Sequence, residues 1–268
     1  MLELAYSPCP NDTFVFHAWA HGLVEGPEVN VTFADVDVTN HAAERGEFDV
    51  VKVSYAALPW LLDRYTLLDC GGALGRGCGP LVLSAGRTDL NGATIAVPGE
   101  RTTAYLLFRL WLQGVEPGRI EVVPFHEIMP GVRDGRFDAG LVIHEARFTY
   151  QNFGLTALAD LGEWWETETG NPIPLGAILV RKGLDAAAIA ETVRASVRHA
   201  WQDPSASREY VLAHAQEMSD DVVDQHIGLY VNGFTERLGD EGYAAVRELL
   251  GRAAEAGLVP PVEVTRAA

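Results

Sequence analysis

Two polar side chains end two apolar segments that begin with the same type of turn. Gly46-Glu47-Phe48-Asp49 leads into the segment that ends at Ser54, and Gly135-Arg136-Phe137-Asp138 leads into the segment that ends at His144. An imidazole, with an unperturbed pKa of about 6.5, can act as a general base near neutral pH. Ser54 lacks the Gly-x-Ser-x-Gly context of a serine nucleophile, so we interpret its hydroxyl as a hydrogen-bonding group for a ligand.

Other polar residues near these segments have two alternative roles each. An isolated histidine is more often structural than catalytic, and the match with Ser54 is what favours a base at His144. Lys52 lies on the same strand face as Ser54 and could form a Schiff base, but a buried lysine more often pairs with a carboxylate. Thr102 and Thr103 open a helical segment, where they either cap the helix or help its free N–H groups to bind a carboxylate. We predict that the two threonines contact a ligand.

The sequence does not indicate a metal or nucleotide site. His144-Glu145 lacks a second histidine four residues later, and the three cysteines show no Cys-x-x-Cys spacing. The glycine-rich segment 71–80 contains no Gly-Lys-Ser/Thr and opens no helix, so it is interpreted as a hinge or an anion-binding loop.

These side chains need elements that bring them to one edge of a sheet. Apolar strands alternate with helical segments in the first three-quarters of the chain, which predicts an α/β architecture with parallel strands and crossover helices. After Lys182, apolar residues at four-residue spacing predict helices that pack on the core. The predicted strands are Leu2–Ser7, Val29–Val36, Asp49–Ser54, Leu81–Ser84, Ala93–Val97, Ile120–Pro124, Asp138–His144 and Ala177–Arg181. The predicted helices between them are Thr13–His21, Thr39–Arg45, Thr103–Gln113 and Ile128–Asp134.

The repeated Gly-x-Phe-Asp turn predicts two similar α/β lobes. Ligands of open parallel sheets bind beyond the carboxyl ends of the strands, so Ser54 and His144 would face each other across a cleft between the lobes. The loop Ser7–Phe14 would lie at the same edge, with Asp12 or Thr13 as the cap of the following helix. We expect lobe 1 to comprise residues 1–86 and 176–268, and lobe 2 to comprise residues 87–175.

Composition limits the class of partner. The net charge of −17, from 37 acidic and 20 basic residues among 268, argues against nucleic acid or an anionic membrane, although local hydrogen-bond donors can still bind a small anion. No Lys or Arg precedes Arg45, and no run of about 18 residues is wholly apolar, so we predict neither a secretory signal nor a membrane span. The predicted compartment is the cytoplasm, and the oligomeric state is not predicted.

Several motifs together resemble the 1,4-dihydroxy-6-naphthoate synthase family. The resemblance covers nearly the whole chain in register and is weakest in about the last thirty residues. The motifs are Ser7-Pro8-Cys9-Pro10-Asn11-Asp12-Thr13-Phe14, Lys52-Val53-Ser54-Tyr55, the glycine-rich segment 71–77, Thr102-Thr103-Ala104-Tyr105, Ile143-His144-Glu145-Ala146-Arg147-Phe148-Thr149-Tyr150, Asp160-Leu161-Gly162-Glu163-Trp164-Trp165 and Pro174-Leu175-Gly176-Ala177-Ile178-Leu179.

This resemblance implies a two-lobed fold like that of type II periplasmic binding proteins, with the ligand cleft between the lobes. It implies a lyase of the futalosine route to menaquinone that cleaves cyclic dehypoxanthine futalosine, a small anionic substrate, to 1,4-dihydroxy-6-naphthoate and dihydroxyacetone without a metal or cofactor. His144 would accept the proton. The residues implied in substrate binding are Ser54, Tyr55, Ala56, Thr102 and Thr103. Two alternatives remain: a chorismate dehydratase of the same pathway, and a non-catalytic solute-binding protein.

Overall fold

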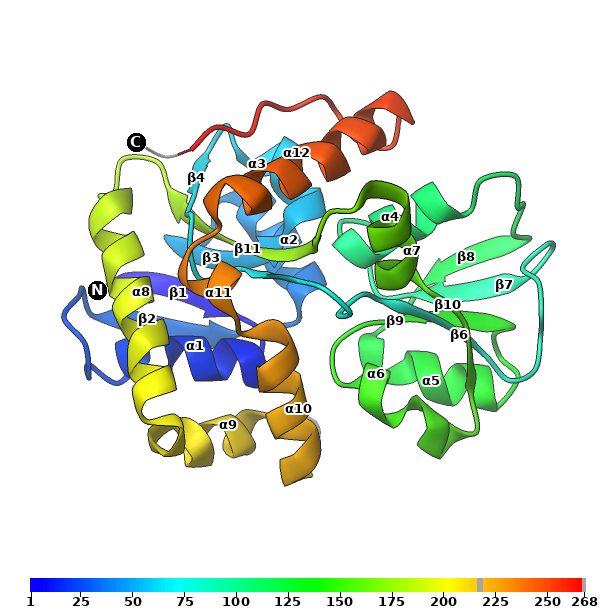
Figure 1. Ribbon diagram of the computed structural model, residues 1–268, viewed down its shortest axis with the longest axis horizontal. Coiled ribbons are helices and arrows are strands. Elements are labelled where there is room, and N and C mark those ends of the chain that lie inside the picture. The colour runs from blue at the N-terminus through cyan, green and yellow to red at the C-terminus, as the bar shows by residue number, and fades with distance from the viewer. Residues whose placement is uncertain (216–218, 267–268) are drawn as a thin grey trace.

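The computed structural model describes residues 1–215 and 219–266, and its strands form two separate sheets. The strands are β1 (Leu2–Tyr6), β2 (Val29–Phe33), β3 (Val50–Ser54), β4 (Tyr65–Leu67), β5 (Ala73–Gly75), β6 (Leu81–Ser84), β7 (Thr94–Val97), β8 (Arg119–Val122), β9 (Ala139–Val142), β10 (Thr156–Asp160) and β11 (Ile173–Arg181). The first sheet has the order β2-β1-β3-β11-β4, with β5 paired to β11, and the second has the order β10-β6-β9-β7-β8. Each sheet forms the centre of one lobe (Figure 1).

Helices pack on both faces of each sheet. They are α1 (Pro10–Ala20), α2 (Val36–Arg45), α3 (Leu58–Leu61), α4 (Thr103–Trp111), α5 (Phe125–Arg133), α6 (Ala146–Thr149), α7 (Leu161–Thr169), α8 (Ala186–Gln202), α9 (Arg208–His214), α10 (Asp220–Tyr230), α11 (Gly233–Glu236) and α12 (Gly239–Glu255). Short 3-10 helices lie at Tyr55–Ala57, Tyr150–Phe153 and Pro204–Ser207. In residues 1–215 and 219–266, no helix is long and apolar enough to cross a membrane.

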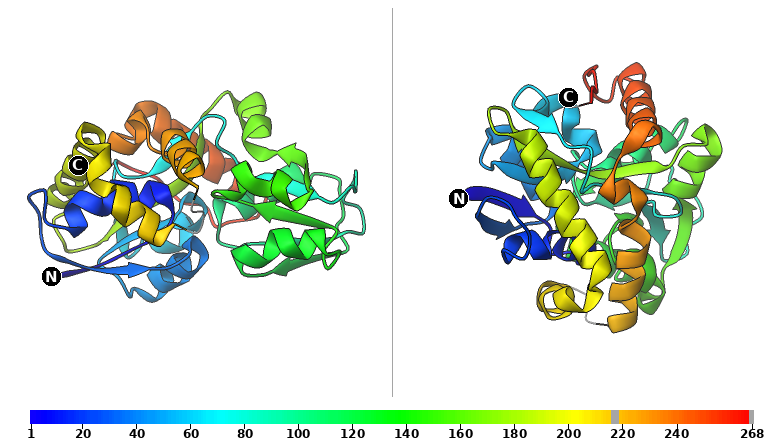
Figure 2. Two further views of the ribbon diagram at one scale, coloured as in Figure 1. Left: turned by 90° about the horizontal axis from the view of Figure 1, so that it is seen from below. Right: turned by 60° about the vertical axis from the view of Figure 1, so that its left-hand side comes forward.

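Side chains that alternate in direction along the strands divide the core of the first lobe into two clusters, one on each face of the sheet. Leu4 and Tyr6 of β1 point into a cluster with α1 and α8, which lie side by side (Figure 2), whereas Ala5 points into the cluster beneath α2 and α12. Successive side chains of a strand point to opposite faces, so a sheet covered on both faces needs apolar residues throughout. The unbroken apolar character of β1 and β3 therefore follows from burial on both faces.

The prediction that all strands run parallel is wrong for two central strands. β1 pairs in parallel with β2 and β3, and β7 pairs in parallel with β8 and β9, but β11 runs antiparallel to β3 and β6 runs antiparallel to β9. Gly176, near the start of β11, lies opposite Ser54 at the end of β3. A strand that enters a lobe at the edge where the parallel strands end must run in the opposite direction.

Two chain segments connect the lobes. The chain leaves the first sheet after β5 and enters the second at β6, then returns through β11, which pairs with β5 along its first residues. β6 lies within residues 1–86, which the sequence placed in lobe 1, but its pairing with β9 and β10 puts it in the second sheet. The first crossing thus precedes β6, and the predicted boundaries elsewhere stay predictions.

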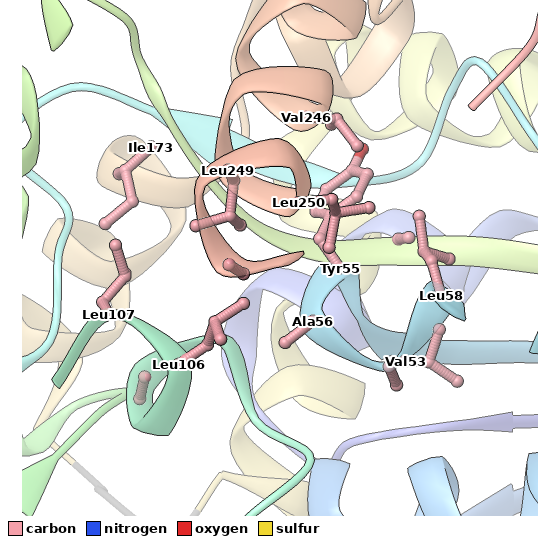
Figure 3. Close-up of a cluster of buried hydrophobic side chains, with 14 of the residues drawn as sticks. Val53, Tyr55, Ala56, Leu58, Leu106, Leu107, Ile173, Val246, Leu249 and Leu250 are labelled. Atoms are coloured by element: carbon pink, nitrogen blue, oxygen red, sulfur yellow. The ribbon is translucent and has the colours of Figure 1, made fainter. Parts of the chain in front are cut away.

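One apolar cluster extends across both lobes. Figure 3 shows Leu106 and Leu107 of α4 together with Leu249 and Leu250 of α12 and with Tyr55, which follows β3. These side chains are all nearly or fully buried. The C-terminal helix α12 therefore packs against elements of both lobes and helps to join them.

Candidate active site

A cleft with about 620 Å³ of unfilled space, part of it open to solvent, lies between the two sheets. It lies beyond the carboxyl ends of β3 and β9, where ligands of open α/β sheets bind. Of the residues predicted to form the site, Ser54, Thr102, Thr103 and His144 line the cleft, and Tyr55 and Ala56 do not. The other lining residues are Ser7, Asn11, Asp12, Val36, Lys52, Ala73, Cys78, Pro80, Ala104, Ile143, Leu175, Gly176, His226 and Tyr230.

His144 has an unusual backbone conformation two residues after β9. Among the residues that the structure describes, it alone combines a side chain with a positive φ, of 55°. Left-handed backbone costs a residue with a Cβ roughly 1–3 kcal/mol, and such residues concentrate at functional sites. Its Nδ1 lies 3.2 Å from the Cys9 Sγ, and its ring meets Phe125 edge-on at 5.4 Å between centroids. The contact with Cys9 occupies Nδ1, so Nε2 is the nitrogen available to a ligand.

Cys9, His144 and Glu145 form a compact polar group at this end of the cleft. Burial, with a smaller effect of Glu145, raises the pKa of the Cys9 thiol well above its usual range, so the thiol stays protonated. Glu145 is buried and its Oε2 has no hydrogen-bond partner within the described part of the chain. Among the residues that the structure describes, these three form the group that could hold a divalent cation, because one ligand atom from each lies within 4.8 Å of the others. A metal-bound cysteine is a thiolate, however, and the raised pKa of Cys9 opposes that form.

Ser54 is held by an amide from the neighbouring helix. The Asn40 Nδ2 donates to Ser54 Oγ at 3.1 Å, and the Ser54 backbone N–H donates to Asn40 Oδ1 at 2.8 Å. The same Asn40 amide also donates to the carbonyl of Arg101 in the second lobe at 3.3 Å. With one lone pair occupied, the Ser54 hydroxyl hydrogen can be donated to a ligand. Sequence reasoning did not identify Asn40, which lies inside a predicted helix.

Thr102 and Thr103 stand at the N-terminus of α4, and both hydroxyls already have partners. Thr102 caps the helix: its Oγ1 accepts the Tyr105 N–H at 3.1 Å and donates to the Gly99 carbonyl at 2.7 Å. Thr103 Oγ1 accepts the Ala56 N–H at 3.2 Å and donates to the Leu175 carbonyl at 2.9 Å. The groups that this position can offer a ligand are therefore the free backbone N–H groups of the first turn of α4.

The other two predicted binding residues lie behind the cleft wall. Tyr55 is buried in the apolar cluster of Figure 3, where burial raises the pKa of its hydroxyl. Ala56 is buried beside it, and its backbone N–H is occupied by Thr103. The structure thus does not bring these two residues to the space that a ligand would occupy.

The buried lysine is neutralised by a carboxylate, as the interpretation of Lys52 favoured. Its Nζ lies 2.6 Å from Asp12 Oδ1 and donates to the Gly71 carbonyl at 3.2 Å, and both charged side chains are almost fully buried. Ser7 Oγ donates to Asp12 Oδ2 at 2.8 Å. The expectation that Asp12 or Thr13 caps the first helix is wrong, because α1 already begins at Pro10, and the Asp12 carboxylate turns toward Lys52 instead.

His226 is a cleft residue that sequence reasoning missed. It is 1% exposed, and its Nε2 lies 3.0 Å from Asn11 Oδ1. Burial, with a smaller effect of His144, lowers the pKa of His226 well below its usual range. Tyr230 follows one helical turn later in α10 and also lines the cleft. The signal that could have identified them is the spacing of His226 and Tyr230, two aromatic residues with polar atoms on one face of a helix. The sequence there was interpreted as helices of the core.

Comparisons with known proteins agree on family and fold. A family model described as menaquinone biosynthesis matches residues 2–255. The chain is 67% identical to a 1,4-dihydroxy-6-naphthoate synthase of Streptomyces coelicolor, over 97% of this chain and 95% of that protein. It is 46% identical to a protein of the same name from Thermus thermophilus, over 97% of this chain and 96% of that protein.

Solved structures confirm the predicted fold. A protein from Archaeoglobus fulgidus superposes with a TM-score of 0.91 at 32% identity, covering 96% of this chain and 98% of the other. The periplasmic aliphatic sulphonate binding protein of Escherichia coli superposes with a TM-score of 0.66 at 13% identity, covering 100% and 93%. At that identity the likeness concerns the fold alone, which is the two-lobed, periplasmic-binding-protein-like α/β fold expected from the sequence.

Proposed function

Because this chain belongs to the menaquinone biosynthesis family, whose members at 67% and 46% identity are synthases, we propose that it is a carbon–carbon lyase of that pathway. Its substrate would be cyclic dehypoxanthine futalosine, and its products 1,4-dihydroxy-6-naphthoate and dihydroxyacetone. The reaction would take place in the cytoplasm. The observation that carries the proposal is the position of His144 in the cleft, on strained backbone and with Nδ1 fixed by Cys9.

His144 would remove the proton that starts the reaction. In the tautomer whose Nδ1 hydrogen is donated to the Cys9 sulfur, Nε2 has a lone pair and can accept a proton from the substrate. Ring opening and retro-aldol-like loss of the three-carbon fragment would follow, and the ring that remains would aromatise. Aromatisation supplies the driving force, so the residues of the cleft need to supply proton transfer and positioning and no redox group.

The substrate carboxylate would bind at the N-terminus of α4. Thr103 and Ala104 of the first turn line the cleft, and a helix N-terminus favours negative charge. The Lys52 ammonium is already neutralised by Asp12, so it adds little attraction for an anion. Binding of a small anion through backbone donors is compatible with the net charge of −17.

Incubation of the purified protein with cyclic dehypoxanthine futalosine, followed by mass analysis, tests this proposal. We expect 1,4-dihydroxy-6-naphthoate and dihydroxyacetone to form in equal amounts. Parallel incubation with chorismate tests the dehydratase alternative, and binding of either compound without turnover would favour a solute-binding protein. Absence of naphthoate from the first incubation would overturn the proposal.

A further inference from the structure

We propose that His226 is a second ligand-binding imidazole of the cleft, which accepts a hydrogen bond through Nδ1 from a hydroxyl group of the ligand. The identity of that ligand rests on the proposed function. Contacts among three buried side chains, those of Asn11, Asp12 and Lys52, connect His226 to β3 of the first sheet.

The chain of contacts determines the orientation of the Asn11 amide. Lys52 Nζ lies 2.6 Å from Asp12 Oδ1, and the Asn11 Nδ2 donates to the same oxygen at 2.9 Å. A carboxylate can only accept, so the NH₂ group of Asn11 must face Asp12 and its Oδ1 must face away. That Oδ1 lies 3.0 Å from His226 Nε2.

The amide orientation in turn determines the tautomer of His226. An amide oxygen can only accept, so Nε2 must carry the hydrogen of this contact. A neutral imidazole then has a lone pair on Nδ1. Burial, with a smaller effect of His144, lowers the pKa of His226 well below its usual range, which keeps the ring neutral at physiological pH.

The lone pair on Nδ1 has no partner in residues 1–215 or 219–266, although the atom is buried. A buried acceptor without a hydrogen bond costs roughly 1–3 kcal/mol, so native proteins seldom retain one without a reason. His226 lines the cleft, and its side chain is 1% exposed. A ligand in the cleft would provide the missing donor.

The chemistry of the lone pair and of the proposed ligand indicates the type of donor. A lone pair repels a carboxylate but accepts a hydrogen from O–H or N–H, and the donors of 1,4-dihydroxy-6-naphthoate are hydroxyl groups, so the ligand group at Nδ1 would be a hydroxyl. A lowered pKa means that His226 holds a proton too weakly to serve as an efficient base near neutral pH. His226 lies on α10, which packs on α1 of the first lobe, whereas His144 follows β9 of the second lobe. A ligand that contacts both would connect the two lobes.

The variant His226→Gln tests the inference. A glutamine can place an NH₂ group near Asn11 Oδ1 but has no atom in place of Nδ1. The hydrogen bond to Asn11 is therefore kept, and the acceptor for the ligand hydroxyl is lost. We expect affinity for 1,4-dihydroxy-6-naphthoate, measured by calorimetry, to fall about 10- to 100-fold. His199→Gln is the matched control, because its Nδ1 is also buried without a described partner and lies outside the cleft, and we expect it to bind as the unmodified protein does.

A second measurement does not depend on the ligand or on the folding of a variant. The ¹⁵N NMR resonances of the imidazoles of the unmodified protein report which ring nitrogen of His226 carries hydrogen, and we expect Nε2. A hydrogen on Nδ1, or unchanged affinity of His226→Gln, would overturn the inference. If the unmodified protein binds neither substrate nor product, the proposed function fails. The NMR measurement on the free protein still tests the inference in that case, because it shows whether Nδ1 of His226 has a free lone pair.

Discussion

The two imidazoles of the cleft are positioned by different means. His144 is half-buried and is placed by strained backbone, with Cys9 and Phe125 against its ring. His226 is fully buried and is placed by an amide that is itself fixed by a charged pair. A base needs access to solvent and substrate, whereas a fixed acceptor needs a rigid and dry site. The two environments therefore suit the two proposed roles.

Replacement of His144 separates its chemical role from its backbone strain. We expect both His144→Ala and His144→Gly to bind 1,4-dihydroxy-6-naphthoate but to lose turnover about 10²- to 10⁴-fold, the usual contribution of a general base. The glycine variant should also be more stable than the alanine variant by about 1 kcal/mol, because only glycine adopts a φ of 55° without strain. Turnover assays and urea unfolding measure the two effects. Unimpaired turnover in either variant would exclude His144 as the base.

The buried histidines make folding stability depend on pH. Burial lowers the pKa of His226 and of His17 in the folded state, so below about pH 6.5 the unfolded chain takes up protons that the folded chain does not. The stability that these groups contribute is thus present above pH 6.5 and is lost as the pH falls toward their folded pKa values. We expect the urea midpoint to fall between pH 7.5 and pH 5, and to fall less in His226→Gln. An equal fall in both proteins would contradict the assignment of His226 as a neutral buried group.

The Gly-x-Phe-Asp repeat performs the same structural task in both lobes. Asp49 Oδ2 accepts the backbone N–H of Glu3 at 2.9 Å, and Asp138 Oδ2 accepts that of Thr94 at 2.8 Å. In each case the carboxylate joins the start of one parallel strand to the start of the next, β1 to β3 and β7 to β9. The repeat therefore aligns the strands whose far ends carry Ser54 and His144.

Removal of these carboxylates should destabilise each lobe. Asp49→Ala and Asp138→Ala each lose an acceptor for a backbone N–H at a partly exposed turn, so we expect a loss of about 1 kcal/mol in the free energy of unfolding. Asp49→Asn and Asp138→Asn keep an oxygen acceptor and should lose less. Urea unfolding measures the difference. Alanine variants as stable as the unmodified protein would show that the repeat does not align the strands through these contacts.

The sequence was most informative where each local pattern had a single structural solution. The strand Leu81–Ser84 was predicted with its observed bounds, and the helix predicted at Thr103 begins there because Thr102 caps it. β4 and β5 escaped prediction because each has three residues, too few for a periodic pattern. The direction of β11 depends on which lobe the chain comes from, which no local pattern encodes.

The residues of the site were predictable where their position follows from a local pattern and the strand order. Strand ends revealed Ser54 and His144, because the position of such residues follows from topology. His226 and Asn11 meet across 215 positions of sequence, so their contact depends on how α10 packs on α1. Tyr55 follows Ser54 directly, yet its side chain points into the core. Sequence proximity to a site residue therefore did not predict which side chains reach the cleft.

Two kinds of contact join the lobes. They share one apolar cluster, in which α12 packs against α4 (Figure 3). Polar contacts between the lobes add to this cluster: the Arg101 Nε lies 2.8 Å from Glu44 Oε1, and its guanidinium lies 3.8 Å above the centre of the Trp60 ring. Partly exposed ion pairs and cation–π contacts each contribute about 1 kcal/mol or less. The polar contacts are thus individually weak, and burial of the shared apolar cluster contributes more to holding the lobes together.

Gly99 lies at a close approach of the two lobes. A Cβ at this position would lie 1.9 Å from the Asp37 Oδ1 of α2 in the other lobe, so a methyl group there requires the Asp37 side chain or the lobe itself to move. We expect Gly99→Ala to hold the lobes apart, which small-angle X-ray scattering would record as a larger radius of gyration. Affinity for 1,4-dihydroxy-6-naphthoate should fall about 10-fold or more, because a ligand that contacts both lobes gains less from an open cleft. Gly251→Ala, whose Cβ would meet nothing within 4 Å, is the control.

A second substitution distinguishes steric separation of the lobes from local damage. Asp37→Gly removes the side chain that the new methyl group would meet, so the double variant Gly99→Ala/Asp37→Gly should regain the compact form and most of the lost affinity. Glycine inside α2 costs about 1 kcal/mol of stability, which lowers the urea midpoint without keeping the lobes apart. If the double variant stays as open as Gly99→Ala, the close approach at Gly99 does not control closure. Recovery would identify this single contact as the limit on how far the two sheets, and the imidazoles that they carry, can converge on a ligand.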